Sequence, residues 1–261
     1  MIQDTTLTDA QYRKLSRIVY DTSGIVLNEK KYRLLVARLS KRMRITHITN
    51  ASDYIDRLGR DEAEFAEFID ATTTNHTFFF RENRHCEYLL KTLKPSVPLK
   101  IWSAASSSGE EAYSIAIQLL ENAFTFSIDA SDISDSMLDQ GRAAVYHKDK
   151  VKNVPKLMLH AYFQRGRKDW IDHVRVKPAV RQLISFRKFN LLSDSPSDSY
   201  DVIFCRNVMI YFDRPTRQRV IDSLCRSLKP GGLFFVGMSE GLHGLEHDLT
   251  SVMPSGYRKK G

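Results

Sequence analysis

The sequence predicts an α/β protein in which a small all-helical N-terminal domain precedes a doubly wound, mostly parallel sheet with a small inserted β subdomain. Three observations lead to this fold class: helical periodicity up to about residue 72, alternation of apolar strands and helices from Leu99 onward, and a break in that alternation over about 150–183. We therefore expect a helical domain over 1–72, an interdomain segment with a helix over 73–98 and a sheet domain over 99–261.

The N-terminal domain is expected to contain four helices. Thr8 and Asp9 can cap the first, which runs to about Thr22, before Gly24 interrupts the chain. The other three are expected over Lys30–Arg44, from near Ser52–Asp53 and from near Asp61–Glu62, and a further helix is expected in the next segment over about Glu82–Leu93.

The helix expected over Lys30–Arg44 is strongly basic, with seven Lys or Arg residues and no acid. Its apolar stripe must pack inward, so the basic residues near its end are expected to project outward: Arg38, Lys41, Arg42 and Arg44. A solvated surface is one interpretation of this face, and a docking site for an acidic helical partner is the other.

The segment Ile101–Ile117 reads as a strand, a turn of small residues and a helix. Ser and Gly at 106–109 would let the backbone approach a ligand closely. Glu110 and Glu111 lie in the first turn of the helix, where they would repel a pyrophosphate but suit a cationic group or ribose hydroxyls.

Further strands and helices continue the alternation. The turn Lys229-Pro-Gly-Gly232 is expected to connect the last predicted helix to the last predicted strand. Strands are expected over 125–130, 184–189, 201–205 and 233–236, and helices over 135–144 and 214–228. The interrupting segment is basic and contains a short alternating run, Val174–Lys177, which indicates a small β subdomain.

Composition limits the class of protein. A chain of 261 residues with 42% hydrophobic residues can build a real core, and no window is apolar enough to span a membrane. The polar N-terminus does not resemble a signal peptide, and three widely spaced cysteines (Cys86, Cys205 and Cys225) indicate reduced thiols in a cytoplasmic protein. The net charge of +8 fits an acidic partner surface or nucleic acid.

Four polar segments follow strands of the predicted sheet and should converge at its carboxyl edge. They are the Ser/Gly turn with Glu110 and Glu111, Asp132, Asn190-Leu191 and the run Phe204–Phe212. Asp132 could accept ribose hydroxyls, and Asn190 could bind the edge of a base. Each also has a plain structural interpretation: a helix cap for Asp132, a turn for Asn190-Leu191 and a surface charge for Arg206.

Several motifs resemble those of the chemoreceptor glutamate methyltransferases of bacterial chemotaxis, the CheR family, over nearly the whole chain. The motifs are Thr74-Asn-His-Thr-Phe-Phe-Phe-Arg-Glu82, Trp102-Ser-Ala-Ala, Ser108-Gly-Glu-Glu-Ala-Tyr-Ser-Ile-Ala116, Ala130-Ser-Asp-Ile133, Tyr162-Phe-Gln-Arg-Gly166, Phe204-Cys-Arg-Asn-Val-Met-Ile-Tyr-Phe-Asp213 and Leu228-Lys-Pro-Gly-Gly-Leu233. The run from Cys205 to Asp213 is the most specific of these.

The resemblance implies a class I methyltransferase-like fold and S-adenosylmethionine as cofactor, with S-adenosylhomocysteine as product. The residues that it implies for cofactor binding are Asn75, Thr77, Arg81, Glu111, Asp132, Asn190, Leu191, Arg206 and Asn207. It places Tyr211 near the reacting methyl group. Arg81 could orient the incoming carboxylate or form a salt bridge between the domains, and Tyr211 could bind the carboxylate or wall the site.

The implied partner is the cytoplasmic helical bundle of a membrane chemoreceptor, with no nucleic acid and no membrane insertion, and we expect a monomer. The basic face with Arg38, Lys41, Arg42 and Arg44 would then meet the receptor. The inserted run Arg165–His173 lacks the second glycine of members that bind a receptor's C-terminal peptide, which argues against that role here. No histidine has metal-ligand spacing, so no metal is predicted.

Two other classes of protein agree with part of the sequence. A nucleic-acid methyltransferase would suit the positive charge, but the chain has Arg206-Asn-Val-Met where enzymes that methylate exocyclic amines commonly have Asp or Asn-Pro-Pro-aromatic. Cys205 would be the nucleophile for cytosine C5 chemistry, and its place in an apolar strand favours a buried structural thiol. A non-catalytic module that senses the cofactor or binds the receptor is the second alternative, against which the presence of Arg81 and Tyr211 speaks.

Overall fold

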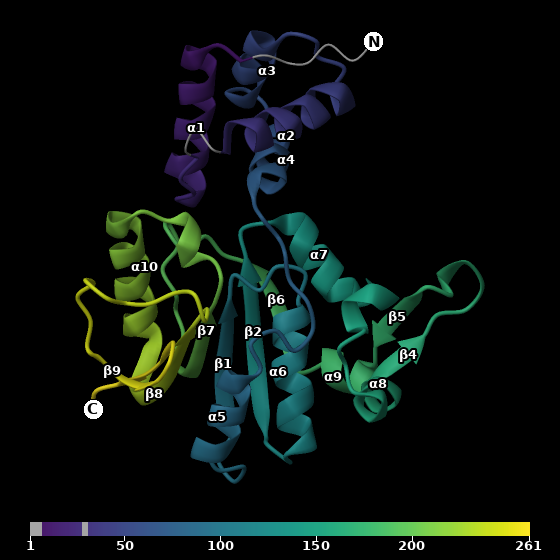
Figure 1. Ribbon diagram of the computed structural model, residues 1–261, viewed down its shortest axis with the longest axis vertical. Helices are drawn as coiled ribbons and strands as arrows, with labels where there is room; N and C mark the ends of the chain where they lie inside the picture. The colour runs from purple at the N-terminus through teal and green to yellow at the C-terminus, as the bar shows by residue number, and fades with distance from the viewer. Residues whose placement is uncertain (1–6, 28–30) are drawn as a thin grey trace. The chain divides into compact units, whose positions relative to one another are not determined.

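The N-terminal helices are α1 (Asp9–Ser23), α2 (Tyr32–Ile45), α3 (Ala51–Leu58) and α4 (Glu62–Thr72) in the computed structural model, which describes residues 7–27 and 31–261 (Figure 1). Segment 1–6, which contains the polar N-terminus, and Lys30, the expected start of the second helix, lie outside the described residues. Contacts along the chain define two compact units, one of 1–74 with 211–216 and one of 75–210 with 217–261.

Capping residues explain where the helices begin and end. Thr8 caps α1 as predicted: Thr8 Oγ1 accepts a hydrogen bond from Gln11 N, and the Gln11 side chain accepts one from Thr8 N, which completes a capping box. Gly24 ends α1 with a φ of 73°, a left-handed conformation that glycine adopts without steric cost. The Asp61 side chain accepts from Glu64 N and starts α4, also as predicted.

The prediction that Arg42 projects outward from α2 is wrong. Its side chain is 11% exposed and pairs with two carboxylates of α4, Glu64 at 2.6 Å and Glu67 at 2.8 Å. Glu64 is itself buried and also accepts a hydrogen bond from Tyr54 of α3. The acids that compensate the positive charge of α2 therefore belong to a neighbouring helix, so the composition of α2 alone does not reveal them.

Arg38 is also turned partly inward, against the prediction. It is half-buried and donates to the carbonyl oxygen of Thr72 and to Thr74 Oγ1. Lys41 and Arg44 are exposed as predicted, and Arg33 shares their exposure. The outward basic face of α2 consequently consists of Arg33, Lys41 and Arg44.

The main sheet has seven strands within the described residues, in the order β6-β2-β1-β7-β8-β10-β9. Five of them run parallel: β1 (Leu99–Ala104), β2 (Phe126–Asp132), β6 (Ile184–Lys188), β7 (Tyr200–Cys205) and β8 (Leu228–Val236). Beyond β8 the sheet ends in two antiparallel strands that no predicted element covers, β10 (Gly256–Lys259) and β9 (Leu249–Met253). Strand order reverses at β1, which lies between β2 and β7, so the sheet is doubly wound as predicted.

Helices connect and cover these strands. They are α5 (Arg84–Thr92) before β1, α6 (Glu110–Glu121) between β1 and β2, α7 (Asp135–Ala143) after β2 and α10 (Arg214–Ser227) between β7 and β8. In the described part of the chain, no helix combines the length and apolar character that crossing a membrane requires.

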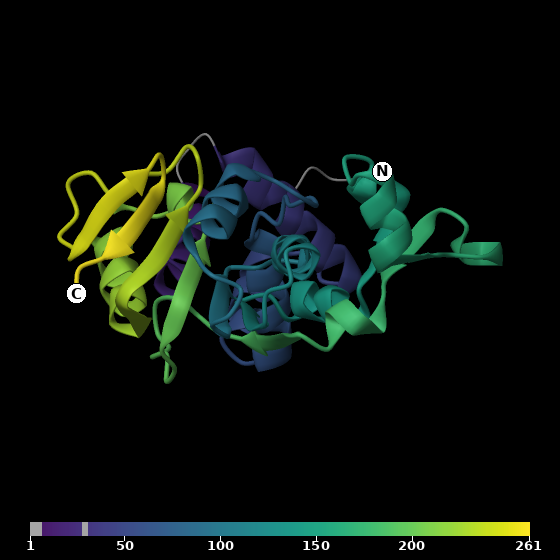
Figure 2. The ribbon, with the colours of Figure 1, turned by 90° about the horizontal axis from the view of Figure 1, so that it is seen from below.

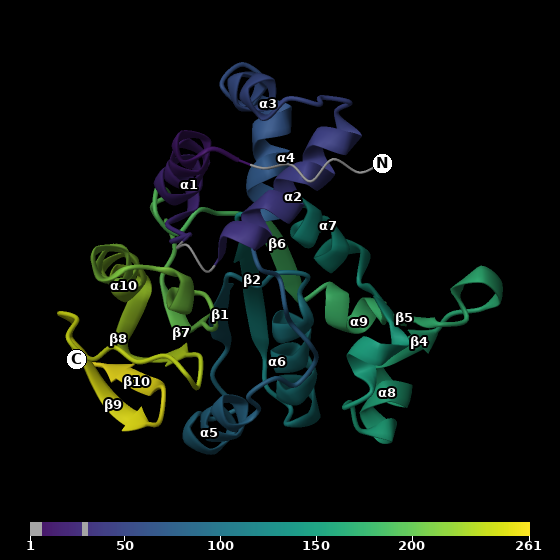
Figure 3. The same ribbon diagram turned by 45° about the horizontal axis from the view of Figure 1, so that its top comes forward.

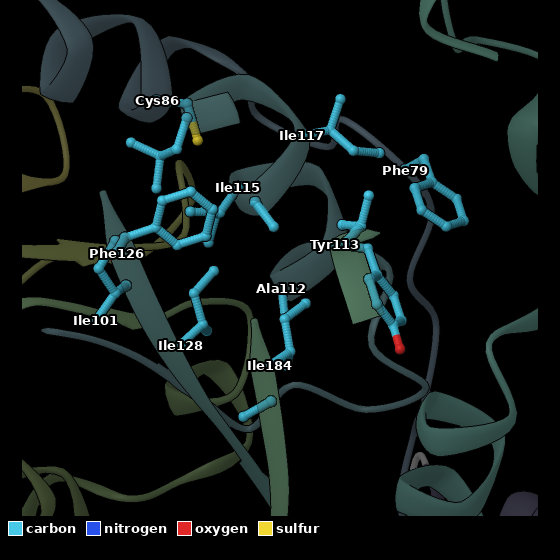
Figure 4. Packing of buried hydrophobic residues seen from close by; sticks show 14 of the residues in the cluster. Phe79, Cys86, Ile101, Ala112, Tyr113, Ile115, Ile117, Phe126, Ile128 and Ile184 are labelled. Carbon is cyan, nitrogen blue, oxygen red and sulfur yellow. The ribbon is translucent and has the colours of Figure 1, made fainter. Parts of the chain in front are cut away.

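Alternation along the strands divides the buried residues between the two faces of the sheet. Ile101 and Val202 belong to the large core cluster with α5 and α6 residues, whereas the neighbouring Trp102 and Ile203 point to the other face and are also fully buried. Figure 4 shows part of this cluster, in which Ile101, Phe126 and Ile128 of the sheet gather with Ala112 and Ile115 of α6 and Cys86 of α5. Burial of both faces explains why these strands read as continuous apolar runs.

The prediction that Lys229–Gly232 form a turn between the last helix and the last strand is wrong, because these residues lie inside β8. The register with β7 shifts here: Tyr200 pairs with Leu228, but Val202 pairs with Leu233. The Pro-Gly-Gly sequence therefore forms an irregularity in a longer strand, not a connection that ends before the strand begins.

The inserted β subdomain is a three-stranded sheet in the order β3-β5-β4. Its strands are β3 (Val145–His147), β4 (Phe163–Arg165) and β5 (His173–Val176), accompanied by α8 (Lys156–Tyr162), α9 (Pro178–Arg181) and two short 3₁₀ segments, η2 (Lys148–Val151) and η3 (Lys168–Trp170). The first strand thus precedes the expected start near residue 150. The β4–β5 hairpin projects away from the main sheet (Figures 1 and 2).

Candidate functional site

The segments expected to converge follow four neighbouring parallel strands, β6, β2, β1 and β7, whose carboxyl ends meet at one edge of the sheet (Figure 3). Direct hydrogen bonds join them. Ser107 N, after β1, donates to the Asp132 side chain at the end of β2, and Phe189 N, after β6, donates to the Asp132 carbonyl. Arg206, after β7, donates to Glu111 in the helix after β1. The structure therefore brings the four segments together at the topological switch point.

The turn after β1 has an unusual backbone. Ala105 and Ser107 adopt positive φ angles of 65° and 49°, and Gly109 has a φ of 89°. A Cβ on Gly109 would lie 2.9 Å from the Phe186 ring. Close approach of a ligand is one reason for a glycine here, but backbone conformation and packing already require it.

Asp132 is the last residue of β2 and is buried. Its two carboxylate oxygens accept from Ser107 N at 2.8 Å and Ser134 N at 3.0 Å. One side chain thus ties the β1 turn to the β2 turn, which places a carboxylate at the centre of the converging edge.

Glu111 and Arg206 form a nearly buried ion pair. Arg206 Nε lies 2.7 Å from Glu111 Oε2, and Ser103 Oγ donates to Glu111 Oε1 at 2.6 Å. Arg206 Nη1 donates to the carbonyl oxygens of Arg81 and Glu82. The pair therefore fixes segment 81–82 against the ends of β1 and β7.

The charge state of this pair follows from its neighbours. Although burial alone would lower the pKa of Arg206, the charges nearby, with Glu111 first among them, raise it. His85 is fully buried and its Nδ1 lies 3.2 Å from Arg206 Nη1. Burial, together with the Arg206 charge, lowers the pKa of His85 to about 4, so the imidazole is neutral at pH 7 and can accept from the guanidinium.

Two acids that sequence reasoning missed hold Asn207. Its side-chain amide donates to Glu82 Oε1 at 3.0 Å, and its backbone N–H donates to Glu240 Oε2 at 2.7 Å. Glu82 stands in the motif already noted beside Arg81, and Glu240 follows β8, at the edge where the other site segments gather. An acid just beyond the carboxyl end of a strand is the signal that would have identified Glu240.

The predicted residues before α5 surround the same turn. The Asn75 carbonyl accepts from Ser107 Oγ at 3.5 Å, and the Thr77 carbonyl accepts from Lys150 Nζ at 2.7 Å. Arg81 Nη1 donates to the His76 carbonyl at 2.9 Å. Among the described residues no carboxylate pairs with Arg81 inside its own compact unit. Both interpretations of Arg81, as an orienting group for a carboxylate and as a salt bridge between domains, stay predictions.

Asn190 and Leu191 follow β6 and form a turn. Asn190 Oδ1 accepts from Leu192 N at 3.0 Å, and Asn190 N donates to Asp194 Oδ2 at 2.8 Å. Both residues are half-buried. The structural interpretation of this pair as a turn holds, and cofactor binding by either residue stays a prediction.

Of the two acids in the first turn of α6, Glu110 has a structural role. It is fully buried, accepts from Ser108 Oγ at 2.6 Å and pairs with Lys150 of the insert at 3.0 Å. Tyr146 of the insert also donates to the Ser108 carbonyl at 2.6 Å. Lys150 and Tyr146 of the inserted subdomain thus contact the turn after β1 and stabilise it.

Backbone strain concentrates in these segments. In the described chain ten residues other than glycine have positive φ angles. Three of them, Ala105, Ser107 and Asn207, belong to the converging segments, and two more, Phe80 and Glu82, lie in the segment whose carbonyls accept from Arg206. Such conformations persist where surrounding contacts enforce them, and they gather at functional sites.

Tyr211 belongs to the other compact unit. Its carbonyl accepts from Val26 N at 2.9 Å, and Lys31 Nζ lies 5.0 Å from the centre of its ring. Its place near a reacting methyl group stays a prediction, as does receptor binding by α2 in the same unit.

Two further observations concern the reactivity of Cys205 and the arrangement of side chains that could bind a metal ion. Burial raises the pKa of Cys205 well above its ordinary value, which makes it a poor nucleophile and weighs against cytosine C5 chemistry. Among residues 7–27 and 31–261, no group of three His, Cys, Asp or Glu side chains is arranged to hold a metal ion.

Two family descriptions match consecutive parts of this chain. Residues 75–257 match the family described as "CheR methyltransferase, SAM binding domain", and residues 10–73 match "CheR methyltransferase, all-alpha domain". The chain belongs to the CheR methyltransferase family. The sequence resemblance is thereby confirmed, and the converging edge lies within the S-adenosylmethionine-binding domain of this family.

Curated relatives match along almost the whole chain. The Chemotaxis protein methyltransferase 2 of Pseudomonas aeruginosa is 39% identical over 265 residues, which cover 98% of this chain and 95% of the relative. The Chemotaxis protein methyltransferase of Klebsiella aerogenes is 38% identical, covering 95% and 89%, and that of Escherichia coli is 36% identical, covering 96% and 91%. Family and relatives together support S-adenosylmethionine-dependent methylation in chemotaxis.

The residues at the edge fit S-adenosylmethionine chemically. Ser106 Oγ, in the turn after β1, is buried and has no hydrogen-bond partner among the described residues. The carboxylates of Asp132 and Glu111 lie within the same converging segments, and carboxylates suit ribose hydroxyls and an ammonium group. A buried hydroxyl without a partner in this turn is a group that a polar cofactor would satisfy.

Proposed function

We propose that this protein transfers the methyl group of S-adenosylmethionine to glutamate side-chain carboxylates of a membrane chemoreceptor, giving glutamate methyl esters and S-adenosylhomocysteine. The observations that support the site most directly are two hydrogen bonds between segments that follow different strands, Ser107 N to Asp132 and Arg206 to Glu111, within the family's cofactor-binding domain. The relatives' names support a role in chemotaxis.

The cofactor would be held by the residues predicted from the sequence: Asn75, Thr77, Arg81, Glu111, Asp132, Asn190, Leu191, Arg206 and Asn207. When bound, it supplies a methyl group already activated by its sulfonium. Asp132 would bind the ribose, and Glu111, held by Ser103 and Arg206, would present a fixed carboxylate to a cationic group.

The acceptor chemistry requires little of the protein. A glutamate carboxylate with a pKa of about 4.3 is ionised at neutral pH, so no general base is needed. Catalysis can rest on alignment and on removal of water from the carboxylate. Arg81 has no carboxylate partner among the described residues, and its planar guanidinium suits bidentate contact with the substrate. Tyr211 would bind or wall the same carboxylate.

The receptor would meet the helical unit through the exposed basic residues of α2. Lys41 and Arg44 remain from the predicted set, with Arg33 added by the structure, whereas Arg38 and Arg42 are occupied by other groups. Acidic helices of a receptor's cytoplasmic bundle would complement this face.

Incubation with methyl-labelled S-adenosylmethionine and membranes from the source cell tests the proposal. We expect label on a large membrane protein that alkali releases as volatile methanol, because carboxyl methyl esters hydrolyse in base. Alkali-stable label, or label on nucleic acid, would reject the glutamate assignment. Cofactor binding without any transfer would favour a non-catalytic module.

A further inference from the structure

The loop after β7 is organised around one buried carboxylate, that of Glu240. Three backbone N–H groups donate to it: Gly237 at 2.6 Å and Asn207 at 2.7 Å to Oε2, and Ile210 at 3.1 Å to Oε1. Met209 N–H contributes as well. A single side chain thus accepts from both the loop after β7 and the loop after β8.

The surroundings are shaped to this carboxylate. A Cβ on Gly237 would lie 2.5 Å from Asn207 Nδ2 and 2.6 Å from Glu240 Oε2, so only glycine leaves room for both groups. Asn207 itself is held at a φ of 60°, in the left-handed region. The loop needs several acceptors at one point, and a carboxylate, which only accepts hydrogen bonds, is the side chain that provides them.

Glu240 forms no ion pair with any described residue, so backbone N–H groups supply its visible stabilisation. Burial raises the pKa of Glu240, while the same N–H groups act in the opposite direction. Burial of a carboxylate without a cation partner costs free energy. Because this carboxylate accepts from Asn207 N, that cost is offset by the fixed position of Asn207 in the site.

We propose that Glu240 is a positioning residue for methyl transfer, which acts by holding the backbone of 207–210 so that Asn207 and Arg206 keep their places in the cofactor site. The chain of contacts is direct: Glu240 accepts from Asn207 N, and the Asn207 side chain donates to Glu82, whose carbonyl accepts from Arg206. The inference rests on the proposed function, because it presumes that Arg206 and Asn207 serve the cofactor.

The test compares Glu240→Gln with a matched control, Glu246→Gln, since Glu246 is exposed after the same strand. Calorimetry measures affinity for S-adenosylhomocysteine, and steady-state kinetics measures kcat and KM. Gln offers one acceptor oxygen and turns an NH₂ toward the backbone donors, so we expect affinity to fall about tenfold in Glu240→Gln and to stay unchanged in the control. Glu240→Asp keeps the charge and should recover part of the loss.

A double-mutant cycle separates positioning from general support of the fold. If Glu240 acts through Asn207, the loss in the double variant Glu240→Gln/Asn207→Ala will be smaller than the product of the two single losses. Multiplicative losses, affinity within twofold of wild type in folded Glu240→Gln, or failure of both the Gln and Asp variants to fold would each overturn the inference. Failure of the wild-type protein to bind the cofactor product would instead reject the proposed function.

Discussion

At the residue scale, the cofactor-site candidates also hold the fold together, which changes how they must be tested. Asp132 accepts two backbone N–H groups, from Ser107 and Ser134. Truncation to alanine would release both turns as well as any ribose contact. The better probe is Asp132→Asn, which keeps the shape and one acceptor oxygen.

We expect Asp132→Asn to weaken S-adenosylhomocysteine binding about ten- to hundredfold. A charge-assisted hydrogen bond contributes roughly 1.5 to 3 kcal/mol, and each 1.4 kcal/mol is about a factor of ten. Calorimetry on the variant, with its thermal unfolding measured alongside, checks this. Unchanged affinity in a folded variant would remove Asp132 from the cofactor site.

Arg81 should contribute more to turnover than to cofactor affinity. Among the described residues, the Arg81 guanidinium donates a hydrogen bond to the His76 carbonyl. Its other N–H groups can then donate to an incoming carboxylate. We expect Arg81→Ala to lower kcat while S-adenosylhomocysteine affinity changes little. If the whole loss appears in cofactor affinity and turnover at saturation is normal, Arg81 only binds the cofactor.

His85 should make stability depend on pH. Its pKa is lowered to about 4 by burial and by Arg206, from an ordinary value of 6.5. The unfolded chain then binds the proton more readily than the folded one, so stability is full above pH 6.5 and is lost as pH falls toward 4. At pH 5 the loss amounts to about 2 kcal/mol.

Urea unfolding at pH 7 and pH 5 measures this loss in wild type, in His85→Gln and in His243→Gln. His243 is exposed and serves as the control. We expect the difference between the two pH values to shrink only in His85→Gln. An equal difference in all three proteins would assign the acid sensitivity to other groups.

At the element scale, local patterns predicted most helices and parallel strands, and pairings between distant elements account for the misses. The capping box at Thr8 and the alternation of strands and helices from β1 to β8 are readable in sequence, because their causes lie within a few residues. The inward turn of Arg42 depends on Glu64 of another helix, and the position of Pro-Gly-Gly inside β8 depends on its register with β7. The role of Glu240 likewise appears only when the loops after β7 and β8 come together.

Among the basic residues of α2, Arg42 should contribute most to stability, because it pairs with two carboxylates of α4. Removal of one partner from a buried ion pair costs about 3 to 5 kcal/mol, because the other charge stays buried without compensation. We expect Arg42→Met to lower the free energy of unfolding of the helical unit on that scale, and Lys41→Met, an exposed control, to change it by less than about 0.5 kcal/mol. Similar values for the two variants would show that Glu64 finds another partner or is neutralised.

At the scale of the whole molecule, the net charge of +8 is concentrated in two segments. Residues 30–44 carry seven Lys or Arg and no acid, and residues 145–183, around the inserted sheet, carry ten against three acids. The rest of the chain is therefore net acidic. A partner that senses only total charge would respond equally to either segment, whereas a receptor docked on the helical unit would respond to α2 alone.

Reversal of Lys41 and Arg44 to Glu should therefore raise the apparent KM for receptor and flatten its dependence on salt, because exposed charges act over a Debye length of about 8 Å at physiological ionic strength. S-adenosylhomocysteine affinity should stay unchanged. The matched control reverses Arg13 and Arg17, two exposed residues of α1 in the same unit, so that net charge changes equally. A KM that rises as much in the control would mean that overall charge attracts the receptor. An unaltered KM at low salt in the Lys41/Arg44 variant would leave α2 as an ordinary solvated face.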